Sequence, residues 1–199
     1  MARARAPSLL SRAVKGLVLW LYRRRGWQLE GQAPSSPRCV IIGAPHTSNW
    51  DFVFFIGTTH EFGLEPRFMG KASLFHWPLR HFMFDMGGVP VKRSAKGNYA
   101  EAMIGAFALH DRFALVIAPE GTRSAVPKWR SGFYHIALGA GVPIVCAWVD
   151  NIGMRGGLGM EIMPSGDIVA DMAKIAAFYR KVMPGHAKWA AFDSMERVA

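Results

Sequence analysis

The sequence of 199 residues contains little cysteine, and its N-terminal part has no long hydrophobic run. The two cysteines, Cys39 and Cys146, lie far apart and form no paired metal-ligand spacing. Both stand inside apolar stretches, so we expect buried, reduced thiols, which suits a cytoplasmic protein. The longest unbroken apolar stretch in the N-terminal segment, residues 16–22, has seven residues, whereas a helix that spans a bilayer needs about 20. This segment is therefore not expected to be a transmembrane anchor.

Acidic residues are absent from the first 25 residues, which hold seven basic ones. The remaining chain has 17 basic and 14 acidic residues, so most of the net charge of +10 belongs to the N-terminal segment. This distribution argues against a nucleic-acid-binding face spread over the whole domain. Hydrophobic residues make up 51% of the chain, and with this length they predict one folded domain with a substantial core.

The N-terminal residues 8–27 have the pattern of a basic amphipathic helix. Leu10, Val14, Leu17 and Leu21 recur at helical spacing, and basic side chains fall on the opposite side. This apolar stripe can pack on the domain, or the helix can lie in an anionic membrane surface, and the two can hold together. Because the apolar stretch runs directly into three arginines with no small-residue cleavage site, we expect no signal peptide. We expect peripheral attachment to the cytoplasmic face of the cell membrane.

Strand-like and helix-like segments alternate after the polar, proline-bearing residues 31–38. This alternation predicts an α/β fold: a single domain with a largely parallel mixed sheet flanked by helices, preceded by the N-terminal amphipathic helix. We divide the chain into that helix, residues 1–30, and the domain, residues 31–199. The expected strands cover residues 38–43, 67–71, 88–92, 113–118, 143–149 and 160–164. The expected helices cover residues 49–62, 76–85, 97–110, 130–140 and 168–183, and the glycine-rich residues 153–160 are expected to form a loop.

The stretch APHTSNWDF, residues 44–52, places His46 and Asp51 five positions apart, directly after the apolar run CVIIG. One interpretation is a helix start, in which Asp51 caps the first turn in an S/T-x-x-D/E pattern. The other is a catalytic dyad, in which Asp51 orients His46 and favours its charged form. The spacing alone favours the helix start, so the choice between the two interpretations depends on other parts of the sequence.

The segment APEGTRS, residues 118–124, follows an expected strand with a proline and a glycine. Arg123 offers a planar fork of donors that suits a phosphate, and Gly121 lets the backbone approach a ligand. The segment is equally typical of an ordinary turn with a solvated arginine. However, ligands of parallel sheets usually bind beyond the carboxyl ends of the strands, and His46 also follows a strand.

Two further segments carry basic residues at or near the ends of expected strands. The segment GGVPVKRS, residues 87–94, ends an expected strand with Lys92 and Arg93, and PKWRSG, residues 127–132, adds two further basic residues. Each segment alone is consistent with a charged strand end or loop. Together they predict a basic, phosphate-sized site beside His46.

Four blocks in this order resemble the signature of the glycerolipid acyltransferase family, which includes the lysophosphatidic acid acyltransferases. The blocks are HTSNWD, GGVPVKR, APEGTRS and VPIV, at residues 46–51, 87–93, 118–124 and 142–145. The resemblance implies that residues 31–199 are an acyltransferase domain. It implies transfer of a fatty acyl group from acyl-CoA or acyl-carrier protein to the hydroxyl of a lysophospholipid-like acceptor such as 1-acyl-glycerol-3-phosphate. No cofactor and no metal are implied.

Carried over by residue, the resemblance makes His46 the general base on the acceptor hydroxyl and Asp51 its orienting partner. With all four blocks present, the dyad becomes the favoured interpretation, and one carboxylate has enough acceptor sites to cap the helix as well. The implied substrate-binding residues, of which the first two would hold the acceptor phosphate, are Lys92, Arg93, Glu120, Gly121, Thr122 and Arg123.

The alternative from a different class is a non-catalytic protein that binds anionic lipid or a membrane surface on the same fold. The intact His46–Asp51 pair argues against it. The chain has no G-x-S-x-G elbow and Cys146 lies mid-strand, so a covalent acyl-enzyme is not expected. The aromatic residues 50, 52, 54 and 55 are expected to pack in the core rather than to line an acyl tunnel. The other histidines form no metal-binding set, and we expect surface or structural roles for His60, His76, His81, His110, His135 and His186.

Overall fold

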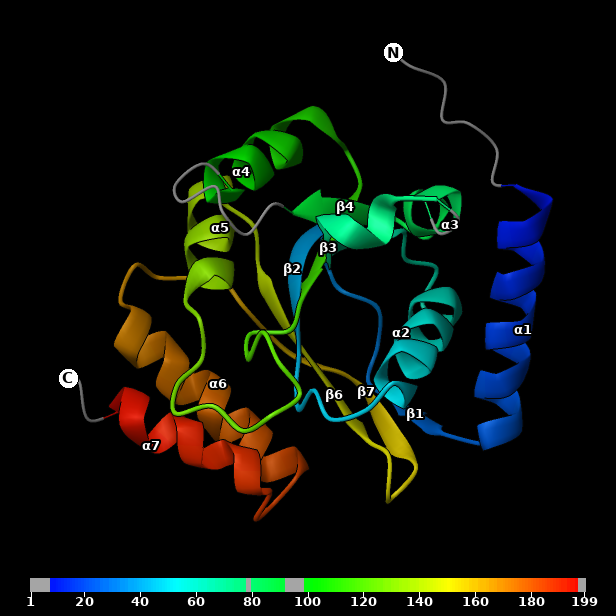
Figure 1. Ribbon diagram of the computed structural model, residues 1–199. Helices are drawn as coiled ribbons and strands as arrows, with labels where there is room; N and C mark the ends of the chain where they lie inside the picture. Colours follow the sequence, from blue (N-terminus) through cyan, green and yellow to red (C-terminus); the bar gives the residue numbers. More distant parts are fainter. Residues whose placement is uncertain (1–7, 78–79, 92–98, 197–199) are drawn as a thin grey trace.

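A largely parallel mixed sheet runs through the protein (Figure 1). The computed structural model describes residues 8–77, 80–91 and 99–196. Within them seven strands pair in the order β1-β7-β6-β2-β5-β3-β4, and every neighbouring pair is parallel except β6 and β7. The predicted fold class is therefore confirmed. The strands are β1 (Gln28–Glu30), β2 (Arg38–Gly43), β3 (Pro66–Lys71), β4 (Gly88–Val91), β5 (Phe113–Ile117), β6 (Ile144–Asp150) and β7 (Arg155–Ile162).

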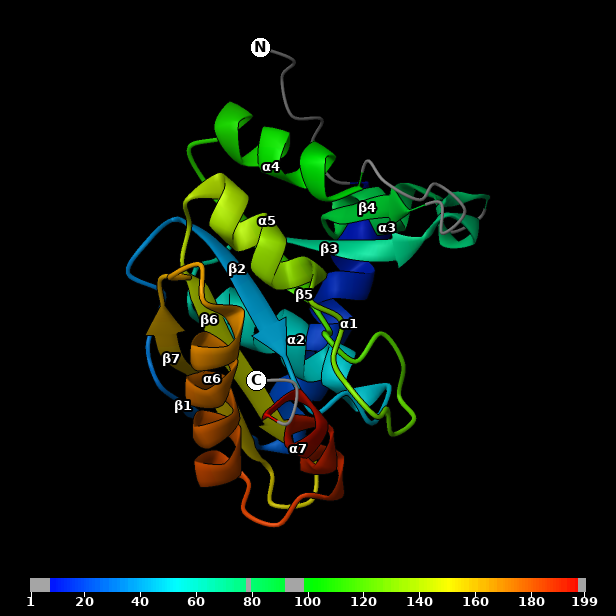
Figure 2. The same cartoon turned by 90° about the vertical axis from the view of Figure 1, so that its left-hand side faces the viewer.

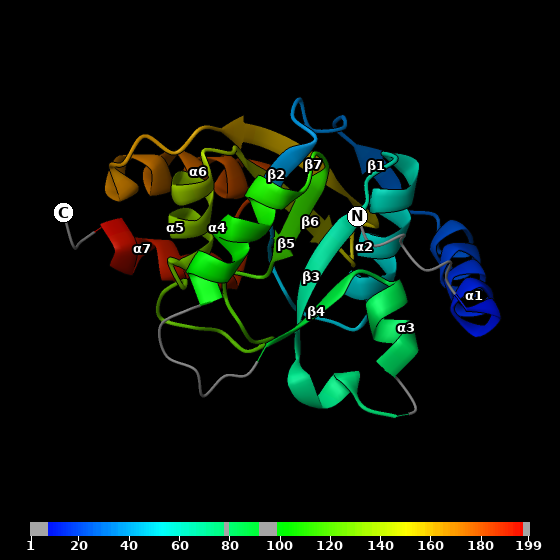
Figure 3. The same cartoon turned by 90° about the horizontal axis from the view of Figure 1, so that it is seen from above.

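Helices lie on both sides of the sheet, as Figures 1 and 3 show from two directions. On one side lie α2 (Trp50–Glu61) and, outside it, α1 (Leu9–Arg25), with α3 (Arg80–Asp85) near the edge strands. The other side carries α4 (Tyr99–Leu109), α5 (Gly132–Ala140), α6 (Ile168–Val182) and α7 (Ala190–Glu196), and Figure 2 shows α5 and α6 in front of the strands. The short 3-10 helices are η1 (Ala72–Phe75) and η2 (Ala187–Trp189).

The central strands are buried on both faces, which explains their uninterrupted apolar sequence. In β2, Val40 and Ile42 belong to the cluster under α5 and α6, while Cys39 and Ile41 belong to a second cluster. Both cysteines are free and buried, as the sequence predicts. Burial, with a smaller contribution from Glu161, raises the pKa of the Cys39 thiol to about 12. This thiol is therefore protonated and inert at neutral pH.

Helix α1 is fixed to the domain at both ends. At its start the Ser11 Oγ donates to Asp85 Oδ2 at 2.5 Å, and near its end Tyr22 stacks on Trp27. Leu10 and Leu17 are exposed, so the interpretation in which the apolar stripe packs on the domain is wrong for these two residues. The buried residues Ser11 and Tyr22 define the packed face instead. The polar anchor at Asp85 and the aromatic contact, rather than leucine burial, fix the rotation of the helix.

The sequence patterns missed β1, α7 and most of β7. The loop expected over residues 153–160 is wrong, because β7 begins at Arg155. Its glycines mark close strand packing: a Cβ on Gly156 would lie 2.5 Å from the Trp148 carbonyl oxygen, and one on Gly157 would overlap Glu30 of β1. Glycine in a strand often marks such an approach of another backbone.

Candidate active site

Three central strands direct their carboxyl ends to one edge of the sheet. In register, Ile42 of β2 lies between Ile117 of β5 and Cys146 of β6. The loop after β2 carries His46, and the turn after β5 carries Glu120, so the expectation that these motifs meet at one edge is confirmed. The turn after β6 adds Asn151.

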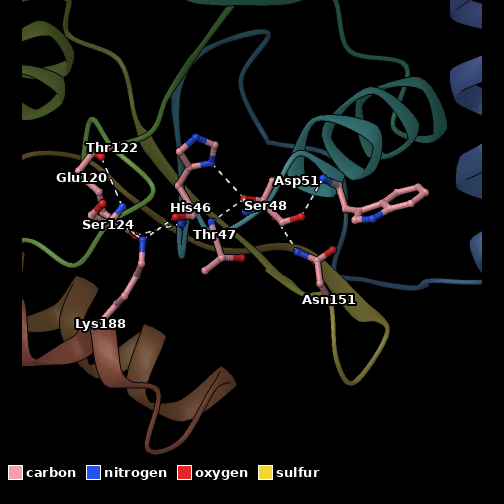
Figure 4. A network of polar contacts seen from close by, with 10 residues as sticks. His46, Thr47, Ser48, Asp51, Glu120, Thr122, Ser124, Asn151 and Lys188 are labelled. Atoms are coloured by element: carbon pink, nitrogen blue, oxygen red, sulfur yellow. Dashed lines mark hydrogen bonds and ion pairs between the residues drawn. The ribbon is translucent and has the colours of Figure 1, made fainter.

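His46 and Asp51 are in direct contact (Figure 4). The distance from His46 Nδ1 to Asp51 Oδ2 is 3.0 Å. The same oxygen accepts the backbone N–H groups of Thr47 at 2.7 Å and Ser48 at 2.9 Å, while Ser48 Oγ accepts the N–H of Trp50. Asp51 thus contacts the imidazole and the backbone of the loop before α2. The Ser48–Asp51 bond matches the predicted capping pattern, but the N–H groups that Asp51 accepts precede the helix, and the first N–H of the helix bonds to Ser48 Oγ instead.

Asn151 completes the environment of this carboxylate. Its Nδ2 donates to Asp51 Oδ1 at 2.6 Å, so both carboxylate oxygens accept hydrogen bonds. Burial raises the pKa of Asp51, but the hydrogen bonds from His46, Ser48, Thr47 and Asn151 outweigh it and hold this pKa below its usual value. Asp51 is therefore ionised at neutral pH, and an anion beside Nδ1 favours the N–H tautomer there. The Nε2 atom is then the ring nitrogen that can take a proton.

Glu120 lies beneath the backbone of His46 and is 2% exposed. Its Oε1 accepts the His46 N–H at 3.0 Å, and its Oε2 forms an ion pair with Lys188. Lys188 Nζ also donates to the His46 carbonyl oxygen at 2.5 Å. Figure 4 shows that Lys188 reaches this position from the C-terminal helical segment. The Glu120 carboxylate therefore supports the loop of His46 and has little surface for contact with a substrate.

The turn after β5 presents the other predicted residues. Gly121 has a φ of 68°, a left-handed conformation that glycine adopts without strain, and its N–H donates to Ala118. Thr122 Oγ1 accepts the N–H of Ser124 at 3.3 Å, and both Thr122 and Arg123 are exposed. Arg123 can thus approach an anion from solvent.

Two predicted phosphate ligands, Lys92 and Arg93, lie outside the described residues.

An apolar cavity of about 260 Å³ opens beside the dyad, between α2 and the sheet. His46 and Asp51 lie among its lining residues, with Phe52, Phe55 and Phe68. The predicted core packing is confirmed for Phe54, which is buried and also borders the cavity. It is wrong for residues 52 and 55, which are half-buried and line the cavity, and for residue 50, which is exposed. The reason is that Phe52 and Phe55 face this space, while Trp50 lies at the surface against Trp27 and Arg25.

The sequence patterns missed Asn151 and Lys188. Asn151 could have been found, because it follows the third central strand at the edge where the other site residues gather. Lys188 gives no such signal: it lies 68 residues from Glu120 and 142 from His46, in a segment that directly follows a helix rather than a strand. Only the folded chain brings it to the site.

Comparison with known proteins bears on this arrangement. The model of the family described as Acyltransferase matches residues 28–150. No curated protein matches the sequence. Among solved structures, the fold is similar to that of the 1-acyl-sn-glycerophosphate (LPA) acyltransferase PlsC from Thermotoga maritima. The TM-score is 0.56 with 17% sequence identity, over 94% of this chain and 80% of that one.

Proposed function

This chain belongs to the acyltransferase family, and from that premise we propose that it acylates a lysophospholipid with His46 as the general base. The donor is an acyl thioester, either acyl-CoA or acyl-carrier protein. The acceptor is a hydroxyl group on a molecule such as 1-acyl-glycerol-3-phosphate, which is the substrate class in the name of the similar T. maritima enzyme. The observation that carries the proposal is the His46–Asp51 pair at the edge of an apolar cavity.

The geometry suits a direct transfer. The acceptor hydroxyl gives its proton to His46 Nε2 while its oxygen bonds to the acyl carbon of the thioester. The carbon–sulfur bond then breaks, and the departing thiolate takes the proton back from the imidazolium. Asp51 holds the ring through Nδ1 and stabilises the charge that forms on it. The step balances without a cofactor and without a covalent acyl-enzyme.

The cavity supports binding of an acyl chain beside this base. Its aromatic and aliphatic lining includes residues of α2 and of β2, β3, β5, β6 and β7, and its volume of about 260 Å³ lies near the lower end of ligand pockets. Phe52 and Phe55 stand on successive turns of α2 and contact each other at 6.2 Å between ring centroids. We propose that these rings contact the acyl chain. Arg123, with Lys92 and Arg93, is proposed to bind the acceptor phosphate.

The direct test is acyl transfer by the purified protein. A labelled acyl-CoA or acyl-carrier protein is incubated with a panel of lysolipids that differ in headgroup, and the products are separated by chromatography. A labelled diacyl product that depends on a phosphate-bearing acceptor supports the proposal. Binding of lysolipid without any labelled product would identify the chain as a non-catalytic lipid-binding protein.

We further propose that α1 holds the protein on the cytoplasmic face of the membrane. Leu9, Leu10, Leu17 and Trp20 are all more than half exposed, beside the exposed basic residues of the same helix. Each basic residue near an anionic surface contributes about 1 kcal/mol of attraction. Within the described residues, no helix has the length and apolar character needed to cross a bilayer. The contact proposed is therefore an interfacial one.

The double substitution Leu17→Ser with Trp20→Ser tests this contact without disturbing the packed face of α1. It should reduce co-sedimentation with anionic liposomes and lower activity on long-chain substrates, while soluble short-chain analogues are turned over as before. The matched control is Leu109→Ser, a leucine at the end of α4 that is even more exposed than Leu17 and Trp20. Unchanged sedimentation of the double variant at low and high salt would contradict the proposal.

A further inference from the structure

The C-terminal segment after α6 lies beyond the residues that match the family, yet it reaches the base. Its anchor is Trp189 of η2, which is 4% exposed and contacts Tyr179 and Trp129 through ring centroids 5.2 and 6.5 Å apart. Phe192 of α7 stacks on Trp189 at 5.3 Å. Aromatic pairs at these separations pack favourably. Because Lys188 directly precedes Trp189, this cluster fixes where the Lys188 backbone lies.

The Lys188 side chain joins two parts of the site that are remote in sequence. Its ammonium group forms an ion pair with Glu120 and donates to the His46 carbonyl oxygen at 2.5 Å. Glu120 in turn accepts the His46 N–H at 3.0 Å. The two polar groups of the His46 main chain are thus held by the two members of one ion pair. Asp51 holds the ring, and this second contact set, the Lys188–Glu120 clamp, holds the backbone.

The burial of Lys188 distinguishes it from a lysine that is free to bind a substrate. The Lys188 side chain is 10% exposed and the Glu120 side chain 1% exposed. A buried carboxylate needs a partner of opposite charge, and the lysine supplies it. A ligand phosphate would have to take the ammonium from Glu120 and leave that carboxylate unpaired.

We propose that Lys188 is a positioning residue for the acyl transfer, acting through the backbone of His46. This inference rests on the proposed function, since it takes His46 as the base. Misplacing a reacting group by about 1 Å can lower a rate about 100-fold. Loss of the clamp should therefore lower kcat and leave the binding of both substrates nearly unchanged.

The test compares Lys188→Met with Lys188→Arg, which keeps a charged donor, and with Lys174→Met as the matched control. Lys174 pairs with Asp171, whose side chain is fully buried, on α6 and outside the site, so its loss also strips a buried carboxylate of its cation. For Lys188→Met we expect kcat to fall about 10- to 100-fold, with each KM within about twofold of wild type. Lys188→Arg should recover most of kcat, and Lys174→Met should retain it.

A second readout does not depend on any activity. Hydrogen exchange of the His46 amide, followed by NMR, should accelerate at least about tenfold in Lys188→Met, because its acceptor Glu120 loses its partner. The Thr47 and Ser48 amides, which donate to Asp51, should change far less. If Lys188→Met does not fold, Lys188→Met with Glu120→Gln removes both charges, and we expect the same loss of kcat.

Several outcomes would overturn the proposal. These are unchanged exchange at His46, a kcat within threefold of wild type in a folded Lys188 variant, or an equal loss in Lys174→Met. A raised KM for the phosphate-bearing acceptor at unchanged kcat would make Lys188 a substrate-binding residue instead. If the wild-type protein acylates no lysolipid, the proposed function fails, whereas the exchange data still decide whether Lys188 holds His46.

Discussion

Substitution of Asp51 by asparagine separates the two roles that this carboxylate has in the structure. The side chain keeps its size and one carbonyl oxygen, but it loses the negative charge. That oxygen can still accept the N–H groups of Thr47 and Ser48, which now bond to Asp51 Oδ2. The new amide nitrogen would face the Asn151 amide, whose Oδ1 is buried and accepts no hydrogen bond from a described residue. Rotation of the Asn151 amide can therefore restore a donor–acceptor pair.

The expected loss of stability is consequently modest. Hydrogen bonds to a charged group contribute about 1.5–3 kcal/mol each and neutral ones about 0.5–1.5 kcal/mol. Two backbone bonds to Asp51 that change from one class to the other should together lower the free energy of unfolding by about 2 kcal/mol. For a chain of this size that is a fall in Tm of about 4–8 °C. The catalytic loss should be much larger, about 10²- to 10⁴-fold in kcat, because a neutral amide no longer stabilises an imidazolium.

Steady-state acyl transfer at a temperature well below both values of Tm, together with thermal melting, measures the two effects. Ser48→Ala is the matched control, since it removes the hydroxyl that accepts the Trp50 N–H and leaves the His46–Asp51 contact in place. Ser48→Ala should lower the free energy of unfolding by about 1 kcal/mol and leave kcat nearly unchanged. If Asp51→Asn lowers Tm but keeps kcat within tenfold of wild type, the carboxylate only holds the loop before α2 and the reasoning is refuted.

Further substitutions test other parts of the structure. Arg123→Ala should raise KM for a phosphate-bearing acceptor far more than KM for the acyl donor, and equal effects on both substrates would count against its assignment to the phosphate. Gly57→Ala should destabilise the protein by about 1–3 kcal/mol in urea melts, because the new Cβ would overlap the Tyr22 ring. Gly105→Ala, in open space on α4, should instead raise the free energy of unfolding by as much as about 1 kcal/mol. If Gly105→Ala were the more destabilising of the two, the packing of Gly57 against Tyr22 would be refuted. Burial raises the pKa of Asp171, but its hydrogen bonds lower it to about 2, so its ionised form stabilises the fold above about pH 4, and this contribution is lost toward pH 2. Asp171→Asn should lower the free energy of unfolding by about 2 kcal/mol at pH 7, and this difference from wild type should vanish near pH 2.

The parts of the site that could be predicted share a local signal. His46 and Glu120 follow apolar strands, and the rule that ligands of parallel sheets bind at the carboxyl ends is enough to place them together. The contact between His46 and Asp51 is also local, because both belong to one loop and the first turn of α2. The apolar run of residues 38–43 predicted the strand β2, which the structure buries on both faces. Such features depend on neighbours in the sequence, which a pattern can show.

The parts that could not be predicted depend on tertiary contacts. The face that α1 presents to the domain is set by Ser11 on Asp85 and by the Tyr22 stack, contacts that a count of leucines does not reveal. The glycines of β7 resemble a loop until neighbouring strands require their small size. Lys188 and Glu120 are remote in sequence, so only the tertiary structure brings this ion pair together.

The most direct measurement is the rate of acyl transfer by His46→Ala relative to wild type, with melting curves to show that both are folded. His46 is the group proposed to take the acceptor proton, and its side chain is one-third exposed, so its removal should leave the fold intact. Loss of a general base typically lowers the rate about 10²- to 10⁴-fold. We predict a loss in this range with an unchanged Tm. A folded His46→Ala protein that keeps more than a tenth of the wild-type turnover would show that the base lies elsewhere.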